Sequence, residues 1–148
     1  MAALEGLQDF NLGIFSIHEV PASLRRFYRG PALGEQMLRA SCGAAIVLNP
    51  HGNFMRYGGN MRLFEACGTG TLQITDDRPG VRKWFTVGEH LIIYHNIKHL
   101  REMVSYYLAH EAERRQIAEA GQKHVYAHHT YDQRMARLMT LAEEIRRN

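Results

Sequence analysis

The stretch of sequence that decides the fold is residues 44–75, which read AAIVLNPHGNFMRYGGNMRLFEACGTGTLQIT. It opens with a short, partly β-branched apolar run, passes through a loop with two adjacent glycines, and continues with apolar residues at helical spacing. Another apolar run, residues 71–75, comes next. Strand, loop, helix and strand in this order predict a parallel sheet with helices on its faces.

The pattern extends in both directions from this stretch. Two more apolar runs, residues 12–17 and 91–94, predict strands. Helices are expected at three places between the strands, at residues 34–41, 60–67 and 80–85. Residues 19–32 contain prolines and a glycine without a clean period, so we expect a loop there with about one helical turn.

From Asn96 onward the apolar residues recur at spacings of three and four, which predicts three consecutive helices. Asn96 is expected to cap the first helix. In the second helix, Gly121 is expected to permit close approach to a neighbouring element. The third helix should begin at the capping-box pattern of residues 130–133, with an apolar face from Met135 to Ile145.

Composition narrows the class of protein. The 148 residues include 45% hydrophobic side chains, which suits one domain spanning residues 1–148, a single three-layer α/β domain with a parallel sheet and a helical last third. Eighteen basic against fifteen acidic residues are too evenly balanced to predict a nucleic-acid surface.

There is no signal-peptide pattern and no apolar run long enough to span a membrane, so we expect a cytoplasmic protein. Cys42 and Cys67 are expected to be buried and reduced.

The loop between the first predicted strand of residues 44–75 and the following helix is the candidate binding site. Asn49 ends that strand, and ligands of open α/β sheets bind beyond the carboxyl ends of their strands. The backbone N–H groups of Gly58, Gly59, Asn60 and Met61 are suited to an anion at the start of the helix.

Two side chains of the same helix fit a nucleotide. The guanidinium of Arg62 suits phosphate oxygens, and the carboxylate of Glu65, about one turn later, suits the hydroxyls of a ribose. A plain turn and a surface ion pair between these two side chains explain the same residues, and this alternative stays open.

Other polar residues carry weaker expectations. Asp76 and Asp77 follow a predicted strand and suit either a metal ion or, as we expect, turn and capping roles. Nine histidines are present, but only His95 and His99 have a helical metal-ligand spacing, so no metal site is predicted. His18 follows the first predicted strand, where it suits polarising a bound ligand or binding a phosphate, and Arg25 and Arg26 of the same loop suit a diphosphate. A solvated loop explains all three residues equally well, and this alternative stays open.

Five segments occur along the chain in a characteristic order, the runs 45–49, 60–70, 88–94, 117–121 and 129–134. Together they resemble the spore-maturation glycosyltransferase-like family, which is related to the group 1 glycosyltransferases. The resemblance covers about two thirds of the chain, from Gly43 to Leu141. It implies the nucleotide-sugar-binding, C-terminal half of a GT-B fold, in which Glu65 matches the acid that binds the ribose and Gly70 matches the small residue that ends the helix.

The resemblance also implies an activity and its partners. We expect transfer of a sugar from a nucleoside diphosphate sugar to an unidentified acceptor, with Arg62, Glu65 and His18 acting on the donor and no metal or other cofactor. The acceptor side is expected from a second GT-B-type domain or a homodimer. Tyr57 stands where many group 1 enzymes have a second glutamate, so the donor-sugar contact and the stereochemical course stay open. A non-catalytic nucleotide-binding or dimerisation module is the alternative function.

Overall fold

The computed structural model describes residues 2–52 and 55–147, and it is an α/β fold as the sequence predicts. A parallel three-stranded sheet in the order β1-β2-β3 is formed by β1 (Ile46–Asn49), β2 (Leu72–Asp76) and β3 (Ile92–Tyr94). Ile46 pairs with Leu72, and Ile74 pairs with Ile92, so the carboxyl ends of the strands lie along one edge.

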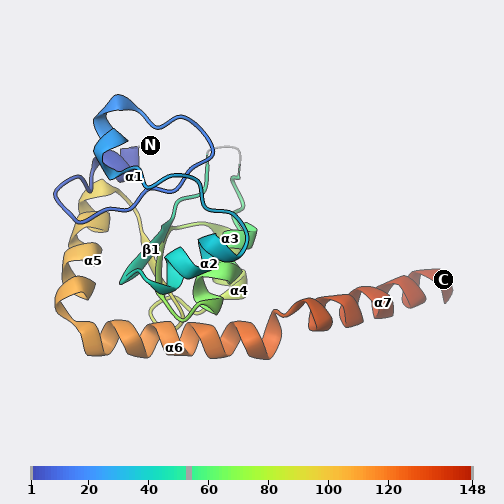
Figure 1. The fold of residues 1–148 in the computed structure, drawn as a ribbon. Helices are drawn as coiled ribbons and strands as arrows, with labels where there is room; N and C mark the ends of the chain where they lie inside the picture. The colour runs from blue at the N-terminus through green and yellow to red at the C-terminus, as the bar shows by residue number, and fades with distance from the viewer. Residues whose placement is uncertain (1, 53–54, 148) are drawn as a thin grey trace.

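Helices cover both faces of this sheet (Figure 1). Alternate side chains of β2 and β3 point to opposite faces, as in any strand. One face packs on α1 (Ala2–Glu5) and α5 (Ile97–Ala109), with Ile74 and Ile92 in that core. The other packs on α3 (Met61–Gly68) and α4 (Pro79–Trp84), with Ile93 in that core. The result is the predicted three-layer arrangement.

The long helix α6 (Glu111–His128) crosses the end of the sheet where the strands begin. A side-chain carbon added to Gly121 would collide with the backbone oxygen of His90, just before β3, so the close approach predicted for Gly121 is confirmed. Because α6 occupies the amino-terminal edge of the sheet, the opposite, carboxyl-terminal edge is the one left for the loops that follow the strands.

The last helix, α7 (Tyr131–Arg147), projects away from the body of the molecule (Figure 1). Thr130 and Gln133 form the predicted capping box, in which the Thr130 N–H donates to the Gln133 side chain at 2.9 Å. None of its side chains is buried, including the apolar face at Met135, Leu138 and Ile145. Among the described residues, no helix is both long enough and apolar enough to cross a membrane.

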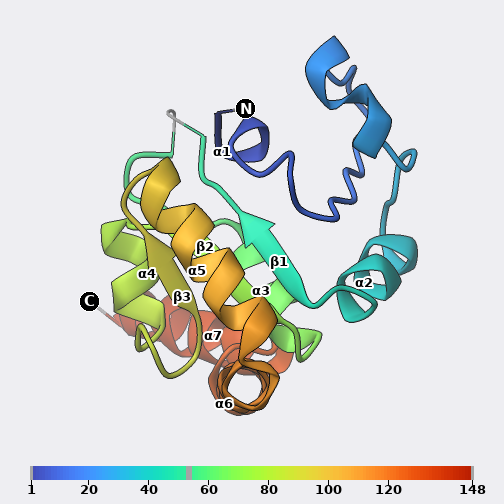
Figure 2. The same ribbon diagram turned by 90° about the vertical axis from the view of Figure 1, so that its left-hand side faces the viewer.

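The segment before the sheet differs from the prediction. Residues 12–17 do not form a strand, because Ile14 makes one isolated bridge, to Tyr28 in the following loop. Phe15 and Ile17 are exposed, which shows that no neighbouring strand covers this run. The short helix η1 (Ala22–Phe27) is the helical turn expected there, and Figure 2 shows this segment extending beside the sheet together with α2 (Glu35–Cys42).

The two cysteines lie in different environments, one buried and one exposed. Cys67 is buried in the core, and burial raises the pKa of its thiol to about 12, which keeps it protonated and unreactive. Cys42 is exposed, so the expectation that it is buried was wrong. The reason is that α2 contains no buried residue and lies at the periphery of the fold.

Candidate functional site

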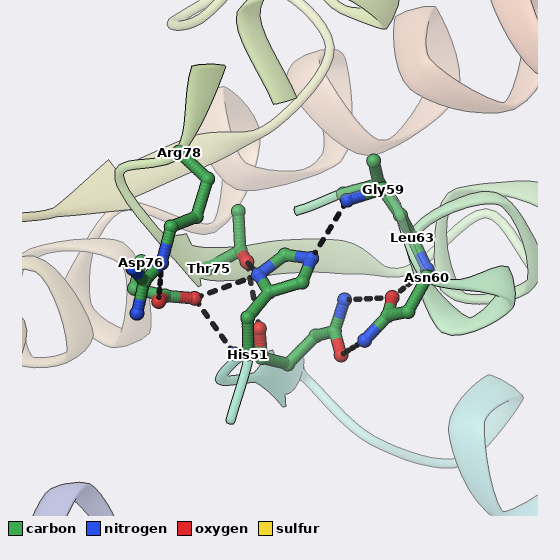
Figure 3. A network of polar contacts seen from close by, with 8 residues as sticks. His51, Gly59, Asn60, Leu63, Thr75, Asp76 and Arg78 are labelled. Atoms are coloured by element: carbon green, nitrogen blue, oxygen red, sulfur yellow. Dashed lines mark hydrogen bonds and ion pairs between the residues drawn. The ribbon is translucent and has the colours of Figure 1, made fainter. Parts of the chain in front are cut away.

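A network of polar side chains fastens the loop after β1 across the carboxyl ends of β1 and β2 (Figure 3). Its centre is His51, whose side chain is fully buried. The backbone N–H and the ring Nδ1 of His51 each lie 2.8 Å from Oδ1 of Asp76, at the end of β2. On the other side of the ring, the Gly59 N–H donates to Nε2 at 3.1 Å. His51 therefore bridges the end of β2 and the glycine turn that precedes α3.

Two asparagines make a second link between strand and helix. Asn49 and Asn60 exchange two side-chain hydrogen bonds of 3.0 Å, amide to amide. The Asn60 side chain also accepts the Leu63 N–H at 3.0 Å, which makes it the N-cap of α3. Thr75 donates to the backbone oxygen of Asn49 at 2.6 Å. The end of β1 and the first turn of α3 are thus held in a fixed relation.

Asp76 is engaged on both of its oxygens. While Oδ1 accepts from His51, Oδ2 accepts from Nε of Arg78 at 2.7 Å. Partial burial acts to raise the pKa of the Asp76 carboxyl, but the hydrogen bonds from His51 and Arg78 outweigh it and hold this pKa below its usual value. Asp76 is therefore a charged structural acceptor at the centre of the network.

Asp77 pairs with Arg82 through two hydrogen bonds of 2.9 Å, and the hydrogen bond from Arg82 lowers the pKa of the Asp77 carboxyl. The turn and capping roles expected for Asp76 and Asp77 were wrong, because α4 has Arg78 at its N-cap without a side-chain cap, and both carboxylates are used in ion pairs and the contact with His51 instead. Within residues 2–52 and 55–147, no cluster of three histidine, cysteine or acidic side chains is arranged to hold a metal ion.

The glycine turn requires its two glycines. Gly58 and Gly59 have φ angles of +83° and +88°, in the region that disfavours residues with a side chain. A side-chain carbon on Gly58 would also lie 2.7 Å from Cβ of Arg78. Asn53 and Phe54, earlier in the predicted loop, lie outside the described residues.

The N–H groups available at the turn differ from those expected. The Gly58 N–H donates to the backbone oxygen of Met55 at 3.2 Å, and the Gly59 N–H donates to His51. Both are engaged within the loop, because the turn itself needs these bonds to close. Among the described residues, the N–H groups of Asn60, Met61 and Arg62 have no acceptor, as befits the start of a helix.

Arg62 and Glu65 form an ion pair with 3.2 Å between Nη1 and Oε2, both side chains being about one third exposed (39% and 30%). The geometry is that of the i,i+3 pair foreseen as the alternative. It does not make a well-aligned hydrogen bond, however, since Nη1 of Arg62 is buried without a hydrogen-bond partner among the described residues. A buried, unsatisfied guanidinium N–H favours an additional acceptor at this position.

The structure does not bring His18 into this network. His18 is exposed, and its backbone N–H and oxygen both contact the side chain of Ser16 in its own loop. Arg25 pairs with Glu19 at 3.7 Å, and Arg26 donates to the backbone oxygen of Gln8. The cause is the missing first strand, since these residues follow a loop and not a strand of the sheet.

Two aromatic side chains, Trp84 of α4 and Phe64 of α3, lie beside the glycine turn. The indole Nε1 of Trp84 would lie 3.6 Å from a side-chain carbon on Gly59. Phe64 of α3 packs edge-on against Trp84, and the guanidinium of Arg134 lies over the Phe64 ring at 4.3 Å from its centre. The first turn of α7 is therefore attached to the same region as the loop.

Sequence reasoning missed His51, Arg78 and Trp84 as parts of the site. Spacing along the chain indicates histidines that share a metal ion, whereas His51 acts through Asp76, which is 25 residues away. A usable signal was present: His51 follows the end of β1 closely and Asp76 ends β2, and adjacent parallel strands bring such positions to one edge.

Comparison with known proteins agrees with this architecture. The family model described as glycosyl transferase-like matches residues 3–140, which include all the elements of the sheet and the network around His51. No curated protein shows a significant match to the chain. On the strength of the family match, which spans nearly its whole length, the chain belongs to the glycosyl transferase-like family.

Proposed function

We propose that this chain binds the nucleoside diphosphate part of a nucleotide-sugar donor for glycosyl transfer, at the carboxyl-terminal edge of the sheet. The observation that carries the proposal is the set of acceptor-free N–H groups on Asn60, Met61 and Arg62 at the start of α3. Backbone N–H groups at a helix start, together with the helix dipole, attract phosphate. The His51 and Asn60 contacts fix these groups before a ligand arrives.

In this proposal Arg62 and Glu65 contact different parts of one donor. The unsatisfied Nη1 of Arg62 hydrogen-bonds a diphosphate oxygen, and the Glu65 carboxylate accepts from the ribose hydroxyls, as the family resemblance implies. Both side chains are partly exposed, so the ion pair between them can open at small cost. We leave His18 out of the proposed site because its contacts lie within its own loop.

The chemistry follows from where charge develops. As the bond between the anomeric carbon and the diphosphate breaks through an oxocarbenium-like state, negative charge grows on the leaving diphosphate. N–H groups and a guanidinium that are already oriented toward that charge stabilise it without reorganisation. The acceptor surface then comes from a second GT-B-type domain or from a homodimer, and the narrower spore-maturation relationship belongs to the same proposal.

Calorimetric titration of the chain with uridine, guanosine and adenosine diphosphates, and with the three nucleosides, tests the donor site. We expect saturable binding of at least one diphosphate and weaker binding of its nucleoside, because the phosphate contacts are then lost. A folded chain that binds none of the diphosphates contradicts the proposal. Transfer assays with the corresponding nucleotide sugars should give no product from the monomeric chain, and product from a homodimer would assign the acceptor surface to the second copy.

A further inference from the structure

The surroundings of His51 determine its protonation state. Its Nε2 faces the Gly59 N–H, a donor, so this nitrogen must carry a lone pair and no proton. Its Nδ1 faces the Asp76 carboxylate, an acceptor, so this nitrogen carries the proton. A neutral imidazole protonated at Nδ1 satisfies both partners. In a doubly protonated ring, the N–H at Nε2 would face the Gly59 N–H, and two donors would meet without an acceptor.

We propose that His51 is a positioning residue for the donor diphosphate, and that it holds the glycine turn in its binding conformation only while its ring is neutral. The inference rests on the proposed function for the identity of the ligand. Its mechanism is the hydrogen bond from Gly59 to Nε2, which orients the turn directly before the open N–H groups of Asn60 and Met61. Protonation of Nε2 removes that bond and releases the turn.

The contact with Asp76 survives the same protonation. The charged groups that face His51 are the Asp76 carboxylate and, on the far oxygen of that carboxylate, the Arg78 guanidinium, while Tyr94 of β3 lies near enough to feel the charge of Asp76. A charged His51 ring keeps its attraction to Asp76. The ring therefore stays anchored to β2, and the change is confined to the turn.

The turn is well suited to such control. Both glycines have positive φ angles, so their conformation is held by the surrounding contacts and not by intrinsic preference. Among the described residues, the other backbone hydrogen bonds of the turn run from the Gly58 N–H to Met55, and from the Gly80 N–H to the backbone oxygen of Tyr57 at 2.7 Å. Neither involves the residue directly before the N-cap Asn60. Gly59 is that residue, and His51 is its acceptor.

The test compares the pH profile of uridine and guanosine diphosphate affinity for the wild-type chain, His51→Gln and His51→Ala. Glutamine offers an amide oxygen to Gly59 and an amide N–H to Asp76, and it gains no proton near neutral pH. As the pH falls, the affinity of the wild type should decrease roughly tenfold more than that of His51→Gln. His51→Ala should bind about tenfold more weakly than the wild type at about pH 8.

Two controls isolate the effect. The terminal phosphate of the ligand itself takes up a proton near pH ~6, and the comparison with His51→Gln removes this contribution because both proteins share it. His128→Gln replaces an exposed histidine outside the network and should keep the wild-type profile. If the diphosphate affinity of His51→Gln changes with pH to the same extent as that of the wild type, the inference is overturned.

A second measurement decides the inference without any nucleotide. Long-range ¹H–¹⁵N spectra of the wild-type chain at about pH 7.5 should show a proton on Nδ1 of His51 and none on Nε2. The Gly59 amide signal should then move with the titration of His51. A proton on Nε2 at that pH, or a Gly59 signal indifferent to His51, overturns the positioning role. Absence of nucleotide binding with these signals intact would refute the proposed function alone.

Discussion

The Nε2 atom of His124, near the end of α6, lies 2.8 Å from the backbone oxygen of Trp84, at the end of α4. Since a backbone oxygen only accepts, His124 donates through Nε2. The Nε2 of His129 lies 3.3 Å from Nε2 of His124. His90 stacks on His124 with 4.2 Å between ring centres. The rings of His90, His124 and His129 thus lie in close contact beside the end of α6.

This histidine cluster predicts that the fold loses stability in mild acid. Burial lowers the pKa of His90 and of His129, and the nearby His124 lowers both further. A histidine with a lowered pKa binds fewer protons folded than unfolded, so the free energy of unfolding rises with pH in that window. The stability contributed is complete above about pH 6.5 and is lost as the pH falls through the two folded pKa values.

Urea denaturation at about pH 7.5 and about pH 5.5 measures this difference. The free energy of unfolding should be smaller at the lower pH, and the difference should shrink in His129→Gln, which cannot take up the proton. His18→Gln, at an exposed position outside the cluster, should leave it unchanged. Equal or greater stability at the lower pH would show that these histidines are not kept neutral by the fold.

Glu65→Gln should weaken the binding of nucleosides and nucleoside diphosphates alike. The ribose is common to both ligands, and a charged hydrogen-bonding contact is worth roughly 1.5 to 3 kcal/mol. Titration calorimetry of both ligand classes measures the loss. Glu35→Gln, which breaks the comparable pair of Glu35 with Arg39 on α2, is the matched control and should bind normally. Unchanged affinity in a folded Glu65→Gln protein would mean that Glu65 contacts no ligand and only forms the surface ion pair with Arg62.

Arg62→Ala should separate the two ligand classes. It removes the unsatisfied Nη1 expected to face the diphosphate, so diphosphate affinity should fall by roughly 1.5 to 3 kcal/mol while nucleoside affinity is spared. The loss should be larger at low salt, where exposed charges are least screened. Arg39→Ala serves as the control for removal of an exposed arginine. If both ligands weaken equally, Arg62 acts on the fold or the ribose and not on the phosphates.

The part of the site that could be predicted is the part encoded locally. The apolar runs of β1 and β2 and the helical residues of α3 depend on neighbours within a few residues, and the structure reproduces the predicted ranges within one or two positions. The closure of the loop depends on His51 meeting Asp76, and therefore on the register between β1 and β2. The spacing of residues along the chain does not indicate that contact directly.

The strand predicted for residues 12–17 failed for a related reason. Its apolar residues suit a strand, but a strand also needs a neighbour that supplies hydrogen bonds and covers its side chains. Ile14 instead exchanges backbone hydrogen bonds with Phe27 and Arg29 of the following loop. Composition alone cannot distinguish a strand that joins the sheet from a segment that folds back on its own loop.

Gly121→Ala should destabilise the fold by about 1 to 3 kcal/mol, because the added methyl group would collide with the backbone oxygen of His90 and push α6 from the sheet. Thermal or urea denaturation measures the change. Gly43→Ala is the control, since its nearest atom would be 3.6 Å away and its φ angle is −80°. That substitution should be neutral or slightly stabilising. Equal effects would mean that α6 does not depend on this close approach.

Nucleoside diphosphate binding should survive removal of divalent cations. Asp76 has both oxygens engaged, by His51 and by Arg78, and Asp77 is engaged by Arg82. A cation at these carboxylates would have to displace a guanidinium and break the network that holds the glycine turn. The N–H groups at the start of α3 and the Arg62 guanidinium supply positive charge in place of a cation.

Titration in excess EDTA should therefore give the same affinity as titration with added magnesium or manganese, within about twofold. Asp77→Asn leaves the His51 network intact and should also bind normally. A large loss in EDTA that magnesium or manganese restores, and that Asp77→Asn reproduces, would instead make this aspartate a metal ligand.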